Sequence, residues 1–235
     1  MLPAWLESPA DTALYAGRVT EREACLVDVY DTLLWVDFAE HRGELPALAG
    51  LSPEAWLAGM RVIGRDTGTG RLTTAEGYEQ LLRTNGAQAP PELVRALVEK
   101  DRELLLGRAR LYDDSLPFLR ELRARRIKIA IVSNCSQHTR DLLESNGVAE
   151  LADALVLSCE FGAFKPAAEI YAYALAQVGA PAEAAVFVDD QPSYCAGAAD
   201  LGITAVQIVR SELRDKVPAP GTTVVRSLAE VESLF

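Results

Sequence analysis

Five short runs of consecutive apolar residues recur along the chain and predict the strands of a buried sheet. They cover residues 24–29, 127–133, 154–158, 185–189 and 203–209. Because adjacent positions in each run are apolar, both faces of each strand should be covered, as in a parallel sheet. Helical patterns separate the later strands at 116–126, 139–147 and 167–179, and the last two end in glycine. This alternation predicts an α/β core, a Rossmann-like doubly wound parallel sheet with helices on both faces.

The long interval between the first two strands contains no comparable strand run and predicts helices instead. One begins with Ser-Pro (52–65), the next with a Thr-x-x-Glu pattern (73–86), and the third with Pro in its first turn (91–107). The glycine-rich segment 64–71 lacks the preceding strand and the Gly-Lys-Ser ending of a phosphate-binding loop, so we expect a flexible linker. We therefore predict a helical domain at 36–112, inserted into a core domain formed by 1–35 and 113–235.

Composition limits the classes of function. Hydrophobic residues make up 49% and charged residues 24% of the chain, which is ordinary for a soluble globular protein. No apolar run approaches the roughly 20 residues that cross a bilayer, and the N-terminal segment lacks the basic flank and apolar run of a secretory signal. We therefore expect a cytoplasmic protein without membrane association. The net charge of -11 argues against nucleic acid as a partner, because phosphate backbones are bound by clustered Lys and Arg.

The four cysteines give no sign of a metal site. They form no Cys-x-x-Cys pair, and the chain has only two histidines, so a zinc site is not expected. We interpret the cysteines as reduced thiols that pack as small buried hydrophobic side chains.

Polar residues with useful chemistry follow four of the predicted strands. They are Asp28 after the first, Ser133 and Asn134 after the second, Lys165 in the loop after the third, and Asp189 and Asp190 after the fourth. Ligands of open parallel sheets bind beyond the carboxyl ends of the strands, so these side chains should converge. Together they supply a nucleophile, a hydroxyl, a cation and an acidic pair.

The segments DVYDTL (28–33), IVSN (131–134), FKP (164–166) and FVDD (187–190) resemble, in order, the four motifs of the haloacid dehalogenase superfamily of hydrolases. The inserted helical domain lies where members with a mobile α-helical cap domain carry theirs. The resemblance implies that Asp28 is a nucleophile that forms a covalent aspartyl intermediate, which water then resolves. It also implies catalytic roles for Ser133, which would orient a substrate oxygen, and for Lys165, which would offset negative charge.

Most members of the superfamily transfer phosphoryl groups with Mg²⁺. The resemblance implies that Asp28, the backbone carbonyl of Tyr30, and Asp189 with Asp190 are the metal ligands. Without a metal, carboxylates 4 Å apart would repel by about 4 kcal/mol per pair at an effective dielectric constant near 20. We therefore favour a Mg²⁺-dependent phosphatase acting on a small phosphorylated molecule.

Tyr30 departs from the phosphatase pattern, which carries a second aspartate at this position. That residue normally protonates the leaving oxygen and later activates water, which a phenol with a pKa of about 10 does poorly. Acyl or aryl phosphates should then be better substrates than alkyl phosphates. Tyr194 is a second departure, since members commonly carry Asp or Asn there. We expect substrate contacts from Tyr30, Asn134 and Thr32, although Thr32 could instead make only a turn hydrogen bond.

Two alternatives stay open at this stage. The Asp-x-Tyr pattern and the spacing of Lys165 and Tyr171 resemble the metal-independent 2-haloacid dehalogenases. The two tyrosine departures together would also suit a non-catalytic protein of this fold that binds a ligand or a partner. An exposed face of the cap could support a homodimer.

Overall fold

The computed structural model describes residues 21–210 and 217–235. The predictions for residues 1–20, which are the start of the core domain and the segment inspected for a secretory signal, lie outside the described residues. Residues 211–216 also lie outside them. None of the helices in the described ranges is both long enough and apolar enough to span a membrane.

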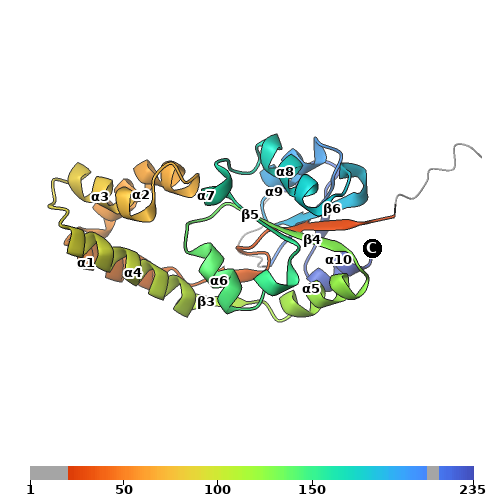
Figure 1. Ribbon diagram of the computed structural model, residues 1–235, viewed down its shortest axis with the longest axis horizontal. Coiled ribbons are helices and arrows are strands. Elements are labelled where there is room, and N and C mark those ends of the chain that lie inside the picture. The colour runs from red at the N-terminus through yellow and green to blue at the C-terminus, as the bar shows by residue number, and fades with distance from the viewer. Residues whose placement is uncertain (1–20, 211–216) are drawn as a thin grey trace, which may run out of the picture.

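A six-stranded sheet forms the centre of the core (Figure 1). Its strands are β1 (Ala24–Val27), β4 (Lys128–Ser133), β5 (Ala154–Leu157), β6 (Ala185–Asp189), β7 (Thr204–Ile208) and β8 (Thr223–Val225). The spatial order is β5-β4-β1-β6-β7-β8, and every neighbouring pair is parallel. Val27 pairs with Ile131 of β4 and with Val188 of β6, so the carboxyl ends of these three strands lie side by side.

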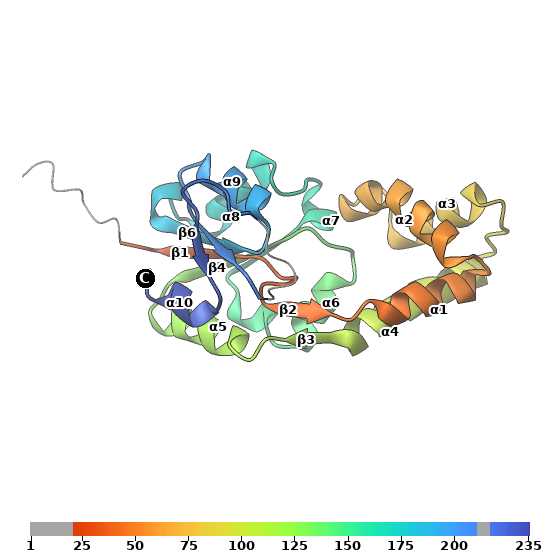
Figure 2. The ribbon, with the colours of Figure 1, turned by 180° about the vertical axis from the view of Figure 1, so that it is seen from behind.

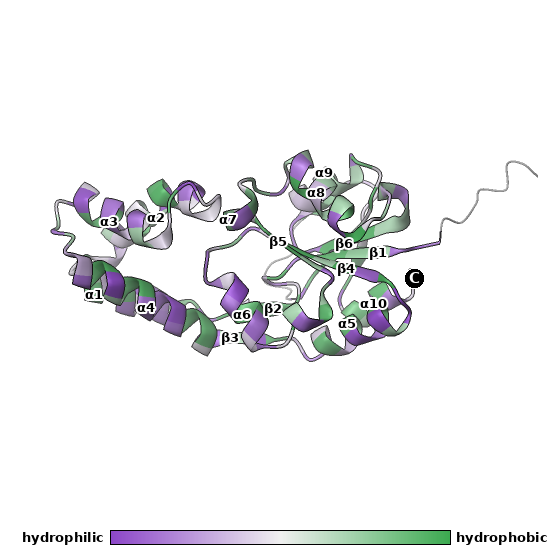
Figure 3. Cartoon of the chain, in the orientation of Figure 1, coloured by the Kyte–Doolittle hydropathy of each residue, from purple (hydrophilic) through white to green (hydrophobic). Residues whose placement is uncertain are grey.

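Helices cover both faces of this sheet, which confirms the predicted α/β fold. One face packs on α5 (Ser115–Ala124), α6 (Thr139–Ser145) and α10 (Leu228–Glu232), and the other on α8 (Ala168–Val178) and α9 (Pro192–Ala199). Figure 2 shows the two layers on opposite sides of the strands. The strands are the most uniformly hydrophobic elements of the core in Figure 3, as expected of strands covered on both faces. The short helix α7 (Ser158–Phe161) follows β5.

Four helices extend from the core between β1 and β4. They are α1 (Ala39–Ala49), α2 (Pro53–Gly68), α3 (Thr74–Thr84) and α4 (Pro91–Arg108), and they lie within the insertion predicted at 36–112. The two connections to the core are the strands β2 (Leu34–Val36) and β3 (Ala109–Leu111), which pair antiparallel. The four helices, called the helical module below, have a hydrophobic cluster of their own that includes Trp56, Ile63 and Leu81.

Two features of the helical module differ from the sequence prediction. Helix α1 was not expected, because Gly43 and Pro46 interrupt its apolar pattern. The prediction of a flexible linker at 64–71 is wrong, because α2 continues to Gly68 and the chain then packs against the core. Gly70 has φ +68°, and a Cβ atom built there would lie only 2.0 Å from the carbonyl oxygen of Cys159 in α7. Glycine is needed here for its backbone conformation and for this close approach.

Candidate active site

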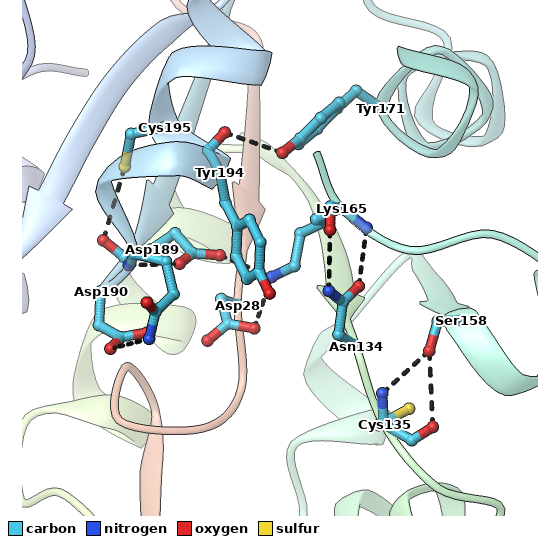
Figure 4. Close-up of polar contacts among 11 residues, drawn as sticks. Asp28, Asn134, Cys135, Ser158, Lys165, Tyr171, Asp189, Asp190, Tyr194 and Cys195 are labelled. Carbon is cyan, nitrogen blue, oxygen red and sulfur yellow. Dashed lines mark hydrogen bonds and ion pairs between the residues drawn. The ribbon is translucent and has the colours of Figure 1, made fainter. Parts of the chain in front are cut away.

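The predicted nucleophile and the predicted cation form an ion pair beyond the sheet. Asp28 directly follows β1 and is 6% exposed, while Lys165 is 2% exposed. Lys165 Nζ lies 2.6 Å from Asp28 Oδ1 and 2.6 Å from Asp189 Oδ2 (Figure 4). Burial alone would lower the pKa of Lys165, but the charges of Asp189 and Asp28 outweigh it and hold the pKa above its ordinary value. Lys165 is therefore a fixed positive charge between two carboxylates.

Aromatic rings surround this lysine. Its Nζ lies 5.2 Å from the centroid of the Tyr194 ring and 5.4 Å from that of Phe187, within range of a cation–π interaction. The Tyr171 hydroxyl donates to the carbonyl oxygen of Tyr194 at 2.8 Å. This hydrogen bond joins Tyr171, noted for its spacing from Lys165, to Tyr194, whose ring lies beside the lysine.

Three carboxylates meet at the ends of β1 and β6. Asp28, Asp189 and Asp190 each offer an oxygen, and these oxygens lie within 4.8 Å of one another. Burial raises the pKa of Asp189 to about 7, with Lys165 acting against the shift and Asp28 reinforcing it. The backbone N–H of Gln191 donates to Asp189 Oδ1 at 2.7 Å, and the Gln191 side chain donates to Asp190 Oδ2 at 2.7 Å.

This set of donors fits a hard divalent cation. Mg²⁺ prefers carboxylate and carbonyl oxygens, and the three aspartates supply three carboxylates at close range. Burial is the main cause of the raised pKa of Asp189, and the nearby charge of Asp28 adds to it, although Lys165 pairs with both carboxylates. A divalent cation held by the three aspartates would add positive charge beside them.

Two buried hydroxyls lie near the nucleophile. Ser133, at the end of β4, and Thr32, in the loop after Asp28, are fully buried, and neither Oγ atom has a hydrogen-bond partner among the described residues. A buried hydroxyl left unpaired costs about 1–3 kcal/mol, so a substrate oxygen that pairs with it gains from the contact. The Thr32 side chain makes no turn hydrogen bond within the described ranges.

Tyr30, two residues after the nucleophile, lines a cavity. Its hydroxyl lies 2.8 Å from Thr139 Oγ1 at the start of α6. Burial raises the pKa of Tyr30 above its ordinary value, and the nearby charge of Asp28 adds to the shift. The phenol therefore keeps its proton at neutral pH.

Asn134, predicted as a substrate contact, has a structural partner in the site. Both polar atoms of its side chain hydrogen-bond to the backbone of Lys165. It also lines the cavity that contains Tyr30. The structure thus gives Asn134 a role in holding the lysine loop.

Sequence reasoning missed Arg210. Its side chain donates from Nε (3.1 Å) and Nη2 (2.7 Å) to the carbonyl oxygen of Thr32, and it pairs with both carboxylate oxygens of Asp114 at 2.8 Å. Arg210 therefore fixes the loop that follows the nucleophile. The rule that ligand-binding residues lie beyond the carboxyl ends of parallel strands could have found Arg210, since this residue follows the strand β7.

The family comparison agrees with this geometry. Residues 23–202 match the model of the haloacid dehalogenase-like hydrolases, and the chain belongs to this family. The resemblance drawn from the four short motifs is thereby confirmed.

Curated relatives include both phosphatases and dehalogenases. The chain is 30% identical over 143 residues to the glyceraldehyde 3-phosphate phosphatase of Methanopyrus kandleri, covering 60% of this chain and 61% of that enzyme. It is 30% identical over 167 residues to the ribulose-1,5-bisphosphate 5-phosphatase of Halopiger xanaduensis (69% and 70% covered). It is also 30% identical over 124 residues to an (S)-2-haloacid dehalogenase of Pseudomonas fluorescens (52% and 55% covered). The match spans less than two thirds of the first and the third of these enzymes.

Solved structures share the fold over nearly their whole length. A haloacid dehalogenase-type phosphatase from Thermococcus onnurineus superposes with a TM-score of 0.65 at 24% identity, covering 90% of this chain and 97% of that one. A dehalogenase superposes with a TM-score of 0.64 at 23% identity, covering 91% and 97%. At this identity the likeness establishes the fold alone.

Proposed function

We propose that the protein is a Mg²⁺-dependent phosphatase that acts through a phosphoaspartate on Asp28. The observation that carries the proposal is the meeting of Asp28, Asp189 and Asp190, whose carboxylate oxygens lie within 4.8 Å of one another. A phosphate dianion brought to this site adds further negative charge, so a cation is needed for the nucleophile to approach it. The phosphatases among the relatives support the same choice.

Each residue of the site has a separate role in this proposed reaction. The Asp28 carboxylate attacks phosphorus, the bond from phosphorus to the leaving oxygen breaks, and a phosphoaspartate forms. Water then attacks that phosphorus, which releases phosphate and regenerates Asp28. Lys165 balances the charge of the carboxylates throughout, and the unpaired hydroxyls of Ser133 and Thr32 are available to phosphoryl oxygens. Mg²⁺, when bound by the three aspartates and the Tyr30 carbonyl, would polarise the phosphoryl group.

Tyr30 restricts the substrates of this reaction. Because its pKa is raised, the phenol neither protonates a leaving alkoxide efficiently nor activates water as a base. The leaving group must therefore depart as a stable anion, which favours acyl and aryl phosphates. The helical module would act as a cap that excludes water when the substrate is bound.

Phosphate release tests the proposal directly. Acetyl phosphate and p-nitrophenyl phosphate should be hydrolysed with Mg²⁺ but not with EDTA, and Asp28→Asn should abolish the reaction. Asp200→Asn, a matched change at an exposed aspartate, should have no effect. Phosphate release that needs neither the metal nor Asp28 would refute the assignment.

A metal-independent dehalogenase is the second candidate. It is favoured by the Asp-x-Tyr pattern and by the ion pair of Lys165 with Asp28, which holds the carboxylate of the nucleophile in place. Halide release from 2-chloropropionate in the presence of EDTA would support it, and no release at high enzyme concentration would exclude it. A cytoplasmic location and a homodimer stay predictions from the sequence.

A further inference from the structure

A large cavity separates the helical module from the core. Its volume is about 670 Å³, within the range of pockets that hold small organic molecules. Helices α1 and α2 contribute Leu45, Trp56 and Met60 to its mainly apolar wall, and the core contributes Tyr30 and Asn134.

This cavity adjoins the reactive end of the site. A second cavity of about 410 Å³ is lined by Lys165 and Tyr194. The two cavities share Met60, Asn134 and Ser136 as wall residues. A molecule whose phosphate lies near Lys165 can therefore extend its remaining part into the larger, apolar cavity.

Two buried histidines and a partly buried aspartate form a polar cluster where helices of the helical module meet the core. Asp101 of α4 is flanked by the only two histidines of the chain, His41 of α1 and His138 just before α6. His41 Nε2 lies 3.8 Å from Asp101 Oδ1, and His138 Nε2 lies 3.6 Å from Oδ2, so neither is hydrogen-bonded. Each histidine is only 8% exposed, and both ring nitrogens of His41 and the Nε2 of His138 have no hydrogen-bond partner among the described residues.

The charges of this cluster are unbalanced. Burial lowers the pKa of His41 and of His138, so both imidazoles are neutral at pH 7. Burial raises the pKa of Asp101, although His138 and a hydrogen bond from the Tyr78 hydroxyl act against the shift. Tyr78, which also lines the cavity, keeps a neutral hydroxyl because burial raises its pKa too. Each neutral imidazole has one nitrogen that accepts and one N–H that donates, so a ligand group that donates a hydrogen bond can pair with the accepting nitrogen of His41, which has no partner among the described residues.

We infer that the larger cavity binds the leaving group of the substrate, and that this group is a bulky aromatic body with a hydrogen-bond donor that reaches Asp101. The inference rests on the proposed phosphatase function. An aryl phosphate fits the site because its aromatic body would fill the mainly apolar cavity between the helical module and the core. The donor, a hydroxyl or an amine, then pairs with the Asp101 carboxylate or with the unprotonated nitrogen of a neutral imidazole.

Four substrates separate the contribution of the aromatic body from that of the hydrogen-bond donor. They are acetyl phosphate, phenyl phosphate, 2-naphthyl phosphate and 6-hydroxy-2-naphthyl phosphate. The second ring should raise kcat/KM by about 10-fold or more over phenyl phosphate, as expected when an apolar group is buried in a fitting pocket. The hydroxyl should raise it by about another 10-fold. Equal kcat/KM values for the three aryl phosphates would overturn the inference while leaving the phosphatase function intact.

Matched variants locate the effect in the cavity. Leu57 and Val62 are both exposed on α2, but Leu57 lines the cavity and Val62 does not appear among its wall residues. Leu57→Trp should lower the ratio of kcat/KM for 2-naphthyl phosphate to that for acetyl phosphate by about 10-fold, and Val62→Trp should leave the ratio unchanged. Equal effects of the two variants would place the aromatic group elsewhere.

Asp101→Asn tests the polar end. It should abolish the preference for the hydroxylated substrate, whereas Glu99→Gln, an exposed change on the same helix, should retain it. A preference that survives Asp101→Asn would remove this cluster from the inference.

A binding measurement keeps the inference testable without turnover. Titration calorimetry with 2-naphthol and 2,6-dihydroxynaphthalene, the alcohols these substrates would release, should show tighter binding of the dihydroxy compound, and Leu57→Trp should weaken both. Such binding without hydrolysis of any phosphate would support the cavity inference and refute the proposed function. Hydrolysis of acetyl phosphate without binding of either alcohol would support the proposed function and refute the cavity inference.

Discussion

The side chain of Asn134 and the backbone of Lys165 are joined by two hydrogen bonds. The Lys165 N–H donates to Asn134 Oδ1 at 2.8 Å, and Asn134 Nδ2 donates to the Lys165 carbonyl oxygen at 3.0 Å (Figure 4). Asn134 directly follows β4, so this pair ties the lysine loop to the end of a buried strand. The position of Nζ between Asp28 and Asp189 depends on that tie.

Asn134→Ala should lower kcat by about 100-fold, because loss of both hydrogen bonds lets Lys165 move and small displacements of site groups have effects of this size. Steady-state kinetics with acetyl phosphate, together with thermal unfolding, would measure it. Asn146→Ala is the control, since Asn146 also accepts a backbone hydrogen bond, from Val148. A kcat within twofold of the wild type would show that Asn134 does not position the lysine.

Tyr30→Asp should raise kcat for an alkyl phosphate such as glycerol 3-phosphate by 10- to 100-fold or more, because it restores a side chain able to protonate the leaving oxygen. Rates on p-nitrophenyl phosphate should change little, since that leaving group needs no proton. Tyr30→Phe removes the contact with Thr139 without adding an acid, and it should give no gain on alkyl phosphates. A comparable gain from Tyr30→Phe would mean that bulk or the hydroxyl contact, rather than a missing acid, limits the reaction.

The core of the fold was predictable because its signals are local. Consecutive apolar residues located the five long strands of the sheet, and the turn and cap residues located most of the longer helices. The strands β2 and β3 were not predicted, because each has three residues and gains its partner only when the two ends of the insertion meet. Helix α1 was not predicted, because Pro46 interrupts the helical pattern of its apolar residues.

The site was predictable to the extent that it follows from strand ends. Asp28, Ser133 and Asp189 converge because parallel strands bring their carboxyl ends to one edge. The meeting of His41 with Asp101 could not be predicted in the same way. It depends on how α1 and α4 pack within the helical module, and no short pattern in the sequence records that packing.

Gly70→Ala should destabilise the protein more than Gly86→Ala does. Both glycines have a positive φ, of +68° and +71°, so both changes introduce backbone strain of about 1–2 kcal/mol. Nothing lies within 4 Å of a Cβ at Gly86, whereas a Cβ at Gly70 would collide with the Cys159 carbonyl. The additional cost should be about 1–3 kcal/mol.

Urea unfolding of the two glycine variants would measure this difference, and the kinetics of the refolded enzyme would show its effect on the site. Gly70 lies in the helical module and packs against α7. A shift that relieves the collision should therefore move the module relative to the core and lower kcat/KM for an aryl phosphate. Equal unfolding free energies for the two variants would mean that the contact between Gly70 and Cys159 is not maintained in solution.

The stability of the protein should fall between pH 7 and pH 5, in part because of His41. Burial lowers its pKa below the ordinary value near 6.5, so on acidification the unfolded chain binds a proton that the folded chain binds less readily. The contribution of His41 to stability is therefore complete above the pKa that His41 has in the unfolded chain. It is lost as the pH falls through the lower pKa that His41 has in the folded protein. Over this pH range, the unfolding free energy measured in urea should fall less for His41→Gln than for the wild type. His138→Gln should behave in the same way, because burial also lowers the pKa of His138. A loss in both variants equal to that of the wild type would mean that the two imidazoles are protonated as readily in the folded protein as in the unfolded chain.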